Sequence, residues 1–312
     1  MSENTKQVWA IIINPKSGKS KYRKQRKYLF GELKHAGIHF DYRVTKFAGH
    51  AIKIAKLFAE RGYKKFLVLG GDGTMSEVIN GIFSAETERT DDIRIAIIPR
   101  GTGNDWARFW GLTRDYKHAT DIFLQAKSRF IDIGQVDYTL EGESTTHYFI
   151  NSLGLGLDAK VVDLTHKLKR FTGSFSFLYT IALLGAVFTY RSRHLTLISD
   201  GKKQIENMFT MSIANGCYSG GGLKQAPNAL PYDGLFDIML ARKPSFRDIL
   251  SGLRYLFKGR LLEHPIITSL QANTLELHSN SDILMEADGI LVYGTPPYRV
   301  KIIPNAIQMI VP

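Results

Sequence analysis

The stretch Leu67–Asn80, LVLGGDGTMSEVIN, determines the fold of the first part of the chain. The apolar residues 66–69 predict a buried parallel strand, which ends at the glycine-rich turn Gly70–Thr74. A helix should follow, because apolar residues then recur on one helical face, at Met75, Val78, Ile79 and Ile82. Glycines let a backbone approach an anion closely, and a helix N-terminus offers it N–H groups. The unit therefore predicts a phosphate site.

Asp72 lies in the middle of this turn. Its carboxylate would repel a phosphate, so we predict that it holds a Mg²⁺ ion that carries the phosphates, or a hydroxyl group that attacks them. The alternative is an ordinary strand-to-helix turn in which Asp72 or Thr74 caps the helix. The complete GGDGT sequence in this context favours the functional interpretation.

Strands and helices alternate on both sides of this stretch. We expect further strands at residues 8–13, 38–45 and 93–98, and helices at 20–36, 48–61, from 106 onward and at 116–125. Two of these strands end in polar turns, Asn14–Lys19 and Pro99–Asp105. The carboxyl ends of parallel strands meet at one edge of a sheet, so the pattern predicts a parallel α/β domain with a ligand crevice there.

The pattern changes near residue 130. Apolar alternation then predominates, at residues 130–136, 147–153, 194–199, 209–214, 236–241, 274–277 and 283–286, with helical stretches at 175–190 and 245–257. This predicts a second, mostly antiparallel β domain. We place the α/β domain at residues 1–133 and the β domain at 134–297. The tail 298–312 should form two short strands that complete either domain.

Composition limits the class of protein. The 312 residues are 44% hydrophobic and 22% charged, as in soluble globular proteins of about two domains. The net charge of +12 predicts an anionic partner: nucleotide, anionic lipid surface or nucleic acid. Nucleic acid is disfavoured, because the basic residues form no aromatic–basic recognition motif. A single cysteine, Cys217, and an N-terminus without a signal-peptide pattern predict a cytoplasmic protein.

Two further segments could contact a membrane. Phe171–Tyr190 is uncharged and about as long as a membrane span, but polar residues dilute it, so we favour a buried or membrane-touching helix. The basic run Lys19–Lys27 is either a solvated face or a contact for phosphates or a membrane surface.

Four motifs occur in the order and spacing of one family. They are INPKSG at Ile13–Gly18, GGDGT at Gly70–Thr74, PRGTGND at Pro99–Asp105, and ADG at Ala287–Gly289 with the tail PNAIQMIVP. The chain resembles the bacterial soluble lipid kinases of the diacylglycerol kinase catalytic-domain family, relatives of sphingosine and ceramide kinases. The resemblance covers nearly the whole chain, although GGDGT alone is shared with NAD kinases.

The resemblance implies an N-terminal nucleotide domain and a C-terminal β-sandwich, with ATP in the cleft between them. The implied nucleotide contacts are Asn14, Pro15, Lys16, Ser17, Gly18, Thr45, Gly71, Asp72, Gly73, Thr74, Met75, Ser76, Glu77 and Thr102. Three carboxylates, Asp72, Asp105 and Asp132, would organise Mg²⁺. The alternatives are a helix cap at Asp105 and a strand-end polar residue at Asp132.

A structural metal site is also implied by the resemblance, at residues 230–235, LPYDGL. Its ligands would be the carbonyl groups of Leu230 and Leu235 and the carboxylate of Asp233, which are oxygen ligands that suit Mg²⁺. The alternative is a plain Asp-Gly turn between strands.

The function implied is ATP-dependent transfer of phosphate to the hydroxyl of a lipid alcohol, diacylglycerol first, in phospholipid biosynthesis. Such an enzyme would act at the surface of an anionic membrane without spanning it. The alternatives are an NAD kinase-like enzyme, or a weakly active or non-catalytic regulator that binds lipid or nucleotide. The sequence leaves open which lipid is used and whether the chain forms a homodimer.

The catalytic base is where the chain departs from the family. The family's fourth motif is Asp-Gly-Glu, and its Glu is the usual candidate for deprotonating the lipid hydroxyl, but Ile290 occupies that position here. We expect Asp288 to take this role. Glu286 is the second candidate, because residues 286, 288 and 290 share one face of an extended segment.

Overall fold

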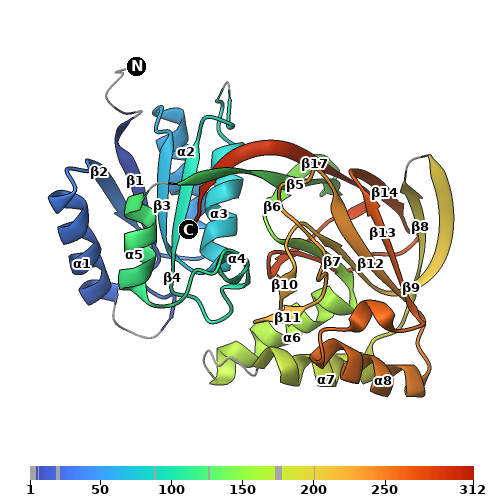
Figure 1. The fold of residues 1–312 in the computed structure, drawn as a ribbon. Coiled ribbons are helices and arrows are strands. Elements are labelled where there is room, and N and C mark those ends of the chain that lie inside the picture. The colour runs from blue at the N-terminus through green and yellow to red at the C-terminus, as the bar shows by residue number, and fades with distance from the viewer. Residues whose placement is uncertain are drawn as a thin grey trace. The chain divides into compact units, whose positions relative to one another are not determined.

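The computed structural model describes residues 5, 7–18, 22–87, 89–125, 127–172, 178–199 and 201–312. Its contacts divide the chain into two compact units (Figure 1). The first unit is Met1–Asp132 together with Asn305–Pro312, and the second is Ile133–Pro304. Two strands, β5 (Ser128–Leu140) and β17 (Thr295–Ile310), contribute residues to both units.

The first unit is a parallel α/β domain. Its strands are β1 (Trp9–Ile13), β2 (Phe40–Val44), β3 (Lys65–Gly70) and β4 (Arg94–Pro99), and its helices are α1 (Tyr22–His35), α2 (His50–Glu60), α3 (Asp72–Phe83), α4 (Asp105–Phe109) and α5 (Tyr116–Gln125). The sheet order is β17-β4-β3-β1-β2. Ile13 pairs with Leu69, and Leu69 with Ile98, so β1, β3 and β4 end side by side.

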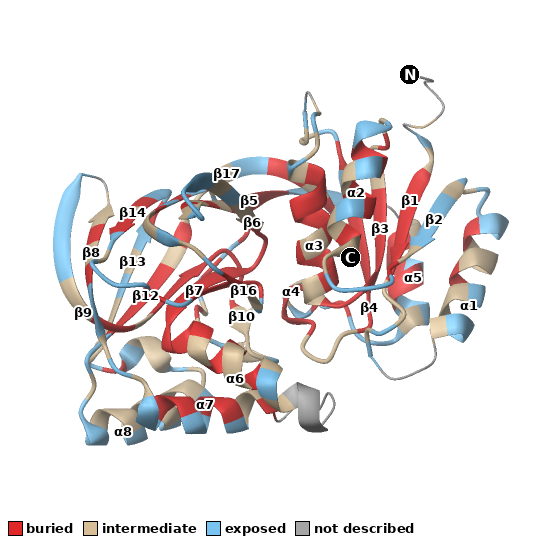
Figure 2. Ribbon diagram, turned by 180° about the vertical axis from the view of Figure 1, so that it is seen from behind, coloured by how far each residue is buried: buried red, intermediate tan, exposed pale blue. Residues whose placement is uncertain are grey.

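Both faces of this sheet are covered, which explains the unbroken apolar strands. Every residue of β1 is buried, as are the last five of β3 (Figure 2). On one face, Leu29 and Leu33 of α1 pack with Phe123 of α5. The other face is covered by α2 and α3, which pack so closely that a Cβ atom on Gly81 would lie 2.3 Å from the Ile52 carbonyl oxygen.

The predicted elements of this unit are confirmed, with ends that move by one or two residues. The helix expected at 20–36 is described from Tyr22, and residues 19–21 lie outside the described residues. Within the rest of the basic run, Arg23, Lys24 and Lys27 are exposed, whereas Arg26 lies 5.8 Å over the ring of Tyr42.

The second unit is mostly antiparallel. Beside β5 and β17 it contains β6 (Glu143–Phe149), β7 (Ser152–Gly156), β8 (Arg193–Ser199), β9 (Lys202–Ala214), β10 (Tyr218–Ser219), β11 (Leu223–Lys224), β12 (Phe236–Arg242), β13 (Ile267–Ala272), β14 (Thr274–His278), β15 (Met285–Ala287) and β16 (Ile290–Val292). The main order is β16-β15-β7-β9-β8-β14-β17, with β12 between β9 and β13, and β5 paired with β6 and β17.

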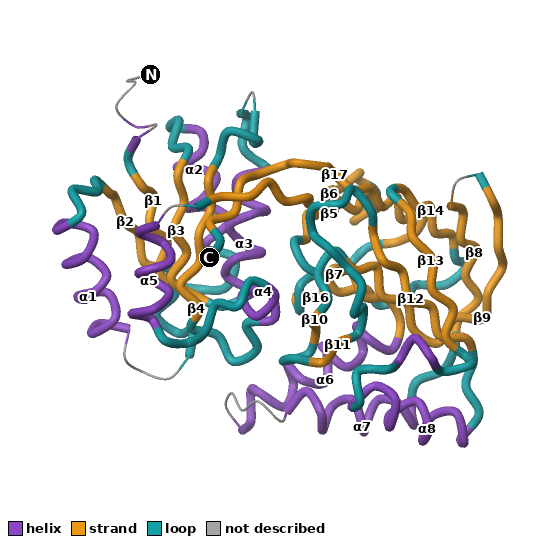
Figure 3. The backbone as a smooth tube through the Cα atoms, in the orientation of Figure 1, coloured by secondary structure: helices purple, strands orange, loops and turns teal. Residues whose placement is uncertain are grey.

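Three helices of this unit are α6 (Leu157–Thr172), α7 (Leu178–Thr189) and α8 (Phe246–Phe257), and Figure 3 shows them on one side of its strands. They enclose a separate apolar cluster that includes Val161, Leu183, Val187 and Phe209. Among the described residues, no helix is long and apolar enough to cross a membrane. The predicted helix at 175–190 is therefore α7, described from Leu178 and partly buried as expected; residues 173–177 lie outside the described residues.

The strands and helices of this unit differ from the prediction in several places, among them β9, which begins at Lys202, and β13, which was not predicted. The strand expected at 147–153 is two strands, because the backbone leaves the ladder at Ile150 and Asn151, whose N–H groups donate to the Asp288 carboxylate. The helix α6 was not predicted at all, although Leu157, Val161 and Leu168 follow helical spacing.

The C-terminal tail also differs from its prediction. Instead of two short strands it is the single strand β17, with a bend at Asn305, where φ is 50°. The N–H of Asn305 donates to the Asp132 carboxylate over 2.8 Å. Before the bend β17 pairs with β14, and after it Gln308 and Met309 pair with β4. The sequence signal for a break was the Pro-Asn pair, which bends this strand without ending it.

Candidate active site

Three turns of the first unit interlock where β1, β3 and β4 end. A Cβ atom on Gly71 would lie 2.7 Å from the Cα of Gly101, and one on Gly18 would lie 2.1 Å from the Arg100 carbonyl oxygen. Gly18 also has a φ of 70°, which side chains rarely tolerate. The three glycine-rich motifs therefore meet at one sheet edge, and their glycines are required there by close backbone contact.

Polar groups tie the same turns together. The side-chain amide of Asn14 donates to the Thr74 hydroxyl over 2.9 Å, and its oxygen accepts from the Lys16 N–H over 3.0 Å. The Arg100 guanidinium donates to the Asn14 carbonyl oxygen over 3.2 Å. These bonds fix the turn Asn14–Gly18 beside the start of α3.

Arg100 was not singled out as a site residue, although it lies within a quoted motif. It is only 5% exposed, and the ring of Tyr22 lies 5.9 Å from its guanidinium carbon. Burial lowers the pKa of the guanidinium from its usual value, yet arginine stays charged in proteins. The turns thus rest on a buried positive charge. The sequence feature that could have identified Arg100 was a single arginine at the end of an apolar strand.

Asp72 does not cap its own helix. The N-cap of α3 is Gly71 in an extended conformation, without a side-chain cap among the described residues. The Asp72 carboxylate instead accepts the N–H of Asp105 over 2.9 Å and so holds the start of α4. Asp72 therefore does not act as a simple helix cap; it connects the GGDGT motif to the PRGTGND motif. The first turn of α3 remains a region of positive potential that suits a phosphate.

The three predicted magnesium carboxylates are not gathered. Asp72 and Asp105 are neighbours through the bond just described, but Asp132 accepts the N–H of Asn305 and ties β5 to β17. Among the described residues, no group of three acidic, histidine or cysteine side chains is placed to hold a metal ion. Among the described residues, Asp72 and Asp105 are neighbours that could form a candidate pair.

Several predicted nucleotide contacts have other partners. The Glu77 carboxylate accepts the N–H groups of Gly49 over 2.9 Å and Ala51 over 3.1 Å, at the N-terminus of α2. Thr45 is buried beside β1, and the side chains of Met75 and Ser76 face the packed interior of the unit. In the turn cluster, Lys16 and Gly18 are exposed, and Pro15, Ser17, Gly73 and Thr102 are partly exposed.

Asp288 accepts several backbone hydrogen bonds in the second unit. It lies with Gly289 in a turn between β15 and β16, at a φ of 52°. Its carboxylate accepts N–H groups from Ile150 over 2.9 Å, Asn151 over 2.8 Å and Ser152 over 3.1 Å. These contacts favour a role in holding the junction of β6 and β7 over the predicted role as proton acceptor.

Glu286 and Asp158 form a second, buried carboxyl pair, on either side of Gly154. A Cβ atom on Gly154 would lie 2.6 Å from a Glu286 oxygen and 2.7 Å from an Asp158 oxygen. Glu286 accepts the Gly289 N–H over 2.6 Å, and Asp158 accepts from Tyr179 and Gln225, each over 3.2 Å. Sequence reasoning missed Asp158. The sequence feature that could have identified Asp158 was a glycine-rich strand end followed by an acidic residue, as in GGDGT.

The surroundings of this pair change its ionisation. Burial raises the pKa of the Glu286 carboxyl well above its usual value, and the negative charge of Asp158 raises it further. Burial also raises the pKa of Asp158. Because two adjacent buried carboxyls cannot easily both ionise, the pair keeps a proton at a pH where an exposed carboxyl has lost its own.

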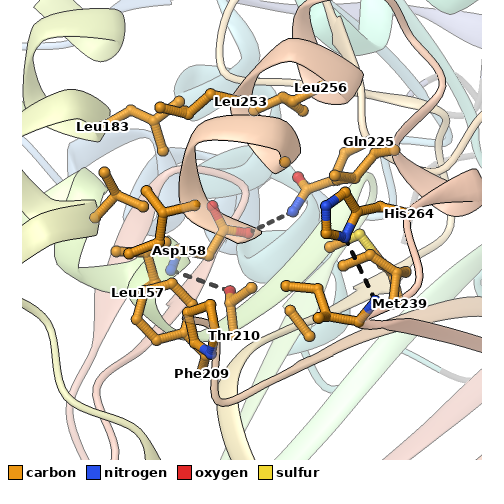
Figure 4. A pocket seen from close by; sticks show the side chains of 18 of the residues that line it. Leu157, Asp158, Leu183, Phe209, Thr210, Gln225, Met239, Leu253, Leu256 and His264 are labelled. Atoms are coloured by element: carbon orange, nitrogen blue, oxygen red, sulfur yellow. Dashed lines mark hydrogen bonds between the residues drawn. The ribbon is translucent and has the colours of Figure 1, made fainter. Parts of the chain in front are cut away.

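Asp158 also lines an apolar cavity of about 100 Å³ (Figure 4). Its wall comes from α6, α7, α8, β9 and β12, with the apolar side chains Leu157, Leu183, Val187, Phe209, Leu253 and Leu256. Asp158, Gln225 and Thr210 are among the polar residues that line it. An apolar cavity with a few polar groups suits a ligand with a hydrocarbon part and a hydroxyl.

The predicted metal segment 230–235 forms a turn. The Asp233 carboxylate accepts the Leu235 N–H over 3.0 Å, and the Leu230 carbonyl accepts the Tyr232 N–H over 2.8 Å. The turn alternative accounts for these bonds. Burial raises the pKa of the nearby Asp237, and the charge of Asp233 raises it further. Binding of Mg²⁺ by the oxygen donors of this segment remains a prediction.

Comparison with known proteins gives matches over both units. The model of the diacylglycerol kinase catalytic domain matches residues 8–136, and that of the YegS C-terminal NAD kinase beta sandwich-like domain matches residues 151–311. The chain is 30% identical to the diacylglycerol kinase of Bacillus subtilis, over 89% of this chain and 88% of that protein. It is 29% identical to the diacylglycerol kinase of Mycobacterium tuberculosis, over 96% and 94%.

Solved structures agree on the fold. A diacylglycerol kinase from Bacillus anthracis matches with a TM-score of 0.78 at 22% identity, over 98% of this chain and 97% of that one. Yeast NADH kinase matches with a TM-score of 0.55 at 11% identity, over 100% and 88%. The predicted fold class, a parallel α/β region followed by a β-sandwich-like domain of the NAD kinase type, is confirmed.

Proposed function

The chain belongs to the diacylglycerol kinase family of lipid kinases, and on that premise we propose that it transfers the γ-phosphate of ATP to the hydroxyl group of diacylglycerol. Lipid phosphotransfer and the use of ATP follow from the family; the choice of diacylglycerol is our proposal. The observation that carries it is the apolar cavity of the second unit, with Asp158 and Gln225 among its polar groups. Such a cavity suits a hydrocarbon chain that ends near a hydroxyl, and not the polar NAD molecule.

The first unit would bind the nucleotide through backbone and positive charge. In this proposal the phosphates lie against the turns Asn14–Gly18 and Gly71–Thr74 and the N-terminus of α3, with Arg100 beneath them. Asp72 and Asp105 would hold Mg²⁺, which supplies charge neutralisation for the phosphates. Phosphoryl transfer depends mostly on such positioning and electrostatic stabilisation, so few reactive side chains are needed.

The second unit would bind the lipid and accept its proton. Ile290 cannot act as a base, and the Asp288 carboxylate already holds three backbone N–H groups. We therefore assign proton acceptance to the Glu286–Asp158 pair. A pair that retains one proton still has one ionised carboxylate, which can take the proton of the lipid hydroxyl as its oxygen attacks the phosphorus atom.

The test is transfer of radiolabel from [γ-³²P]ATP to a panel of lipid alcohols in mixed micelles, with NAD as a separate acceptor. We expect label in phosphatidic acid with diacylglycerol and none in NADP. Label in the phosphate of another lipid alcohol would keep the lipid kinase and replace the substrate. Transfer to NAD, or transfer to no acceptor, would reject the proposal.

An anionic membrane is the expected location of the substrate, and the net charge of +12 favours association with it. The predicted contact through the basic run near α1 remains a prediction. The exposed charges of α1 are accompanied by few exposed apolar groups, because Leu29 and Leu33 face the sheet.

A further inference from the structure

The helix α7, LYTIALLGAVFT, contains no charged residue. Its inner side chains are buried in the second unit, but Ile181, Leu184 and Phe188 are 48%, 43% and 50% exposed. Their spacing of three and four residues places them in one stripe along the outer side of the helix. Surface helices of soluble domains normally present polar residues there, so an apolar outer stripe indicates a surface that meets something apolar.

A second apolar stripe lies on α8. This helix, described throughout, has no buried residue. Its inner side chains Ile249, Leu253 and Leu256 pack against the cluster beneath α7, while Phe246, Leu250 and Phe257 are 65%, 51% and 50% exposed. The rings of Phe188 and Phe246 lie 5.9 Å apart and join the two stripes. We call these six exposed side chains the α7–α8 face: Ile181, Leu184, Phe188, Phe246, Leu250 and Phe257.

Basic residues accompany this face. Arg247 and Arg254 of α8 are exposed, and so are Lys258 at its C-terminal end and Arg191 just beyond α7. The acidic residue of α8, Asp248, is engaged in a capping box with Ser245, and Glu263 just beyond the helix pairs with Arg260. Exposed phenylalanine and leucine with interspersed arginine and lysine are typical of helices that lie in the interface of an anionic bilayer.

The same helices wall the apolar cavity. Leu183 and Val187 of α7 and Leu253 and Leu256 of α8 line it from the inside, while the α7–α8 face is their outer surface. We propose that the α7–α8 face is the surface on which the protein lies on an anionic lipid bilayer, with its apolar side chains at the boundary of headgroups and acyl chains. This inference rests on the proposed function, because docking there would bring the cavity wall against the layer that contains the lipid substrate.

A second copy of the chain fits this face less well. In a symmetric dimer the same patch meets itself, so Arg247, Arg254 and Lys258 of both copies would be brought into one interface. Burying like charges without partners is strongly unfavourable. An anionic bilayer supplies the opposite charge and an apolar layer together.

The first experiment measures binding of the full chain to vesicles without ATP or diacylglycerol, so its result does not depend on kinase activity. The probes are vesicles of phosphatidylcholine alone and of phosphatidylcholine with phosphatidylglycerol. The double variant Phe246→Ser/Phe257→Ser should lower the partition coefficient on anionic vesicles by at least about tenfold. The control is Ile205→Ser/Tyr293→Ser, which removes two side chains of the second unit that are 71% and 64% exposed, and it should bind like wild type.

The second experiment measures how deeply the α7–α8 face enters the bilayer. Phe257→Trp should shift its emission to the blue on anionic vesicles and be quenched by brominated acyl chains, whereas Ile205→Trp should show neither change. Equal binding by wild type and the double phenylalanine variant would overturn the proposal. It would also be overturned if wild type were a dimer that the phenylalanine changes dissociate while vesicle binding stays the same. Failure of lipid phosphorylation alone would leave the binding result intact and reject only the proposed function.

Discussion

The two units position their functional groups by different means. In the first, three short turns approach one another through glycines, and a buried arginine donates a hydrogen bond to one of them. In the second, the groups are buried carboxyl side chains, and each is defined by its partners: three backbone N–H groups for Asp288, and a second carboxyl for Glu286. The first arrangement is determined by short local sequence motifs, whereas the second depends on which strands become neighbours in the fold.

The largest effect should come from the first unit, with Asp72→Asn. We expect phosphoryl transfer to fall by at least about 10⁴-fold, because positioning and charge neutralisation supply most of the rate in this chemistry. The asparagine side chain keeps an oxygen that can accept the Asp105 N–H, so the fold should be retained. Single-turnover kinetics beside a thermal melt check this. Turnover near that of wild type would remove Asp72 from the mechanism.

A smaller but still large effect is expected in the second unit, with Glu286→Gln. Loss of a general base lowers the rate by roughly 10²–10⁴-fold. Asp158→Asn should have a comparable effect, whereas Asp288→Asn should chiefly destabilise the β6–β7 junction. If Asp288→Asn alone abolished transfer without changing stability or ATP affinity, the original assignment of the base to Asp288 would be restored.

Although Glu286→Gln should lower activity, it should raise the stability of the protein at high pH. A carboxyl whose pKa is higher in the folded state than in the unfolded state binds its proton more tightly when folded. Its contribution to stability is therefore complete below the unfolded pKa and is lost as the pH rises through the folded pKa. Burial and Asp158 raise the pKa of Glu286 in this way. Glu286→Gln should then melt at a higher temperature than wild type at pH 8, with a smaller difference at pH 4.

Alanine substitutions at two glycines of the same turn, Gly71 and Gly73, should differ in their effect on stability. A Cβ atom on Gly71 would lie 2.7 Å from backbone of the neighbouring turn, whereas no described atom outside the helix's own backbone lies within 4 Å of one on Gly73. Gly71→Ala should therefore lower the free energy of unfolding by roughly 1–3 kcal/mol. Gly73→Ala should be nearly neutral. Denaturant unfolding of both variants measures the contrast, and equal stability would show that the close packing of the turns is unimportant.

The smallest effect concerns Asp233. If the segment 230–235 binds Mg²⁺, wild type should gain thermal stability as Mg²⁺ is added, and Asp233→Ala should not. Differential scanning calorimetry across a Mg²⁺ titration measures this without any activity assay. Identical curves for both proteins would favour the plain turn.

The sequence predicted most of the first unit and less of the second. Apolar runs followed by glycine turns are sufficient to place parallel strands and to bring their ends to one edge, so the cluster of motifs could be foreseen. The carboxyl pair could not, because Asp158 and Glu286 are far apart in sequence and meet only where β15 pairs with β7. For the same reason Asp288 was identified but its three N–H partners were not.

The most direct test of the account is transfer of the γ-phosphate of radiolabelled ATP to diacylglycerol in mixed micelles, by wild type, Asp72→Asn and Ile290→Glu side by side. The account predicts labelled phosphatidic acid with wild type and almost none with Asp72→Asn. It would be contradicted if wild type labelled no lipid alcohol while Ile290→Glu gained the activity, because the natural chain would then lack an effective proton acceptor.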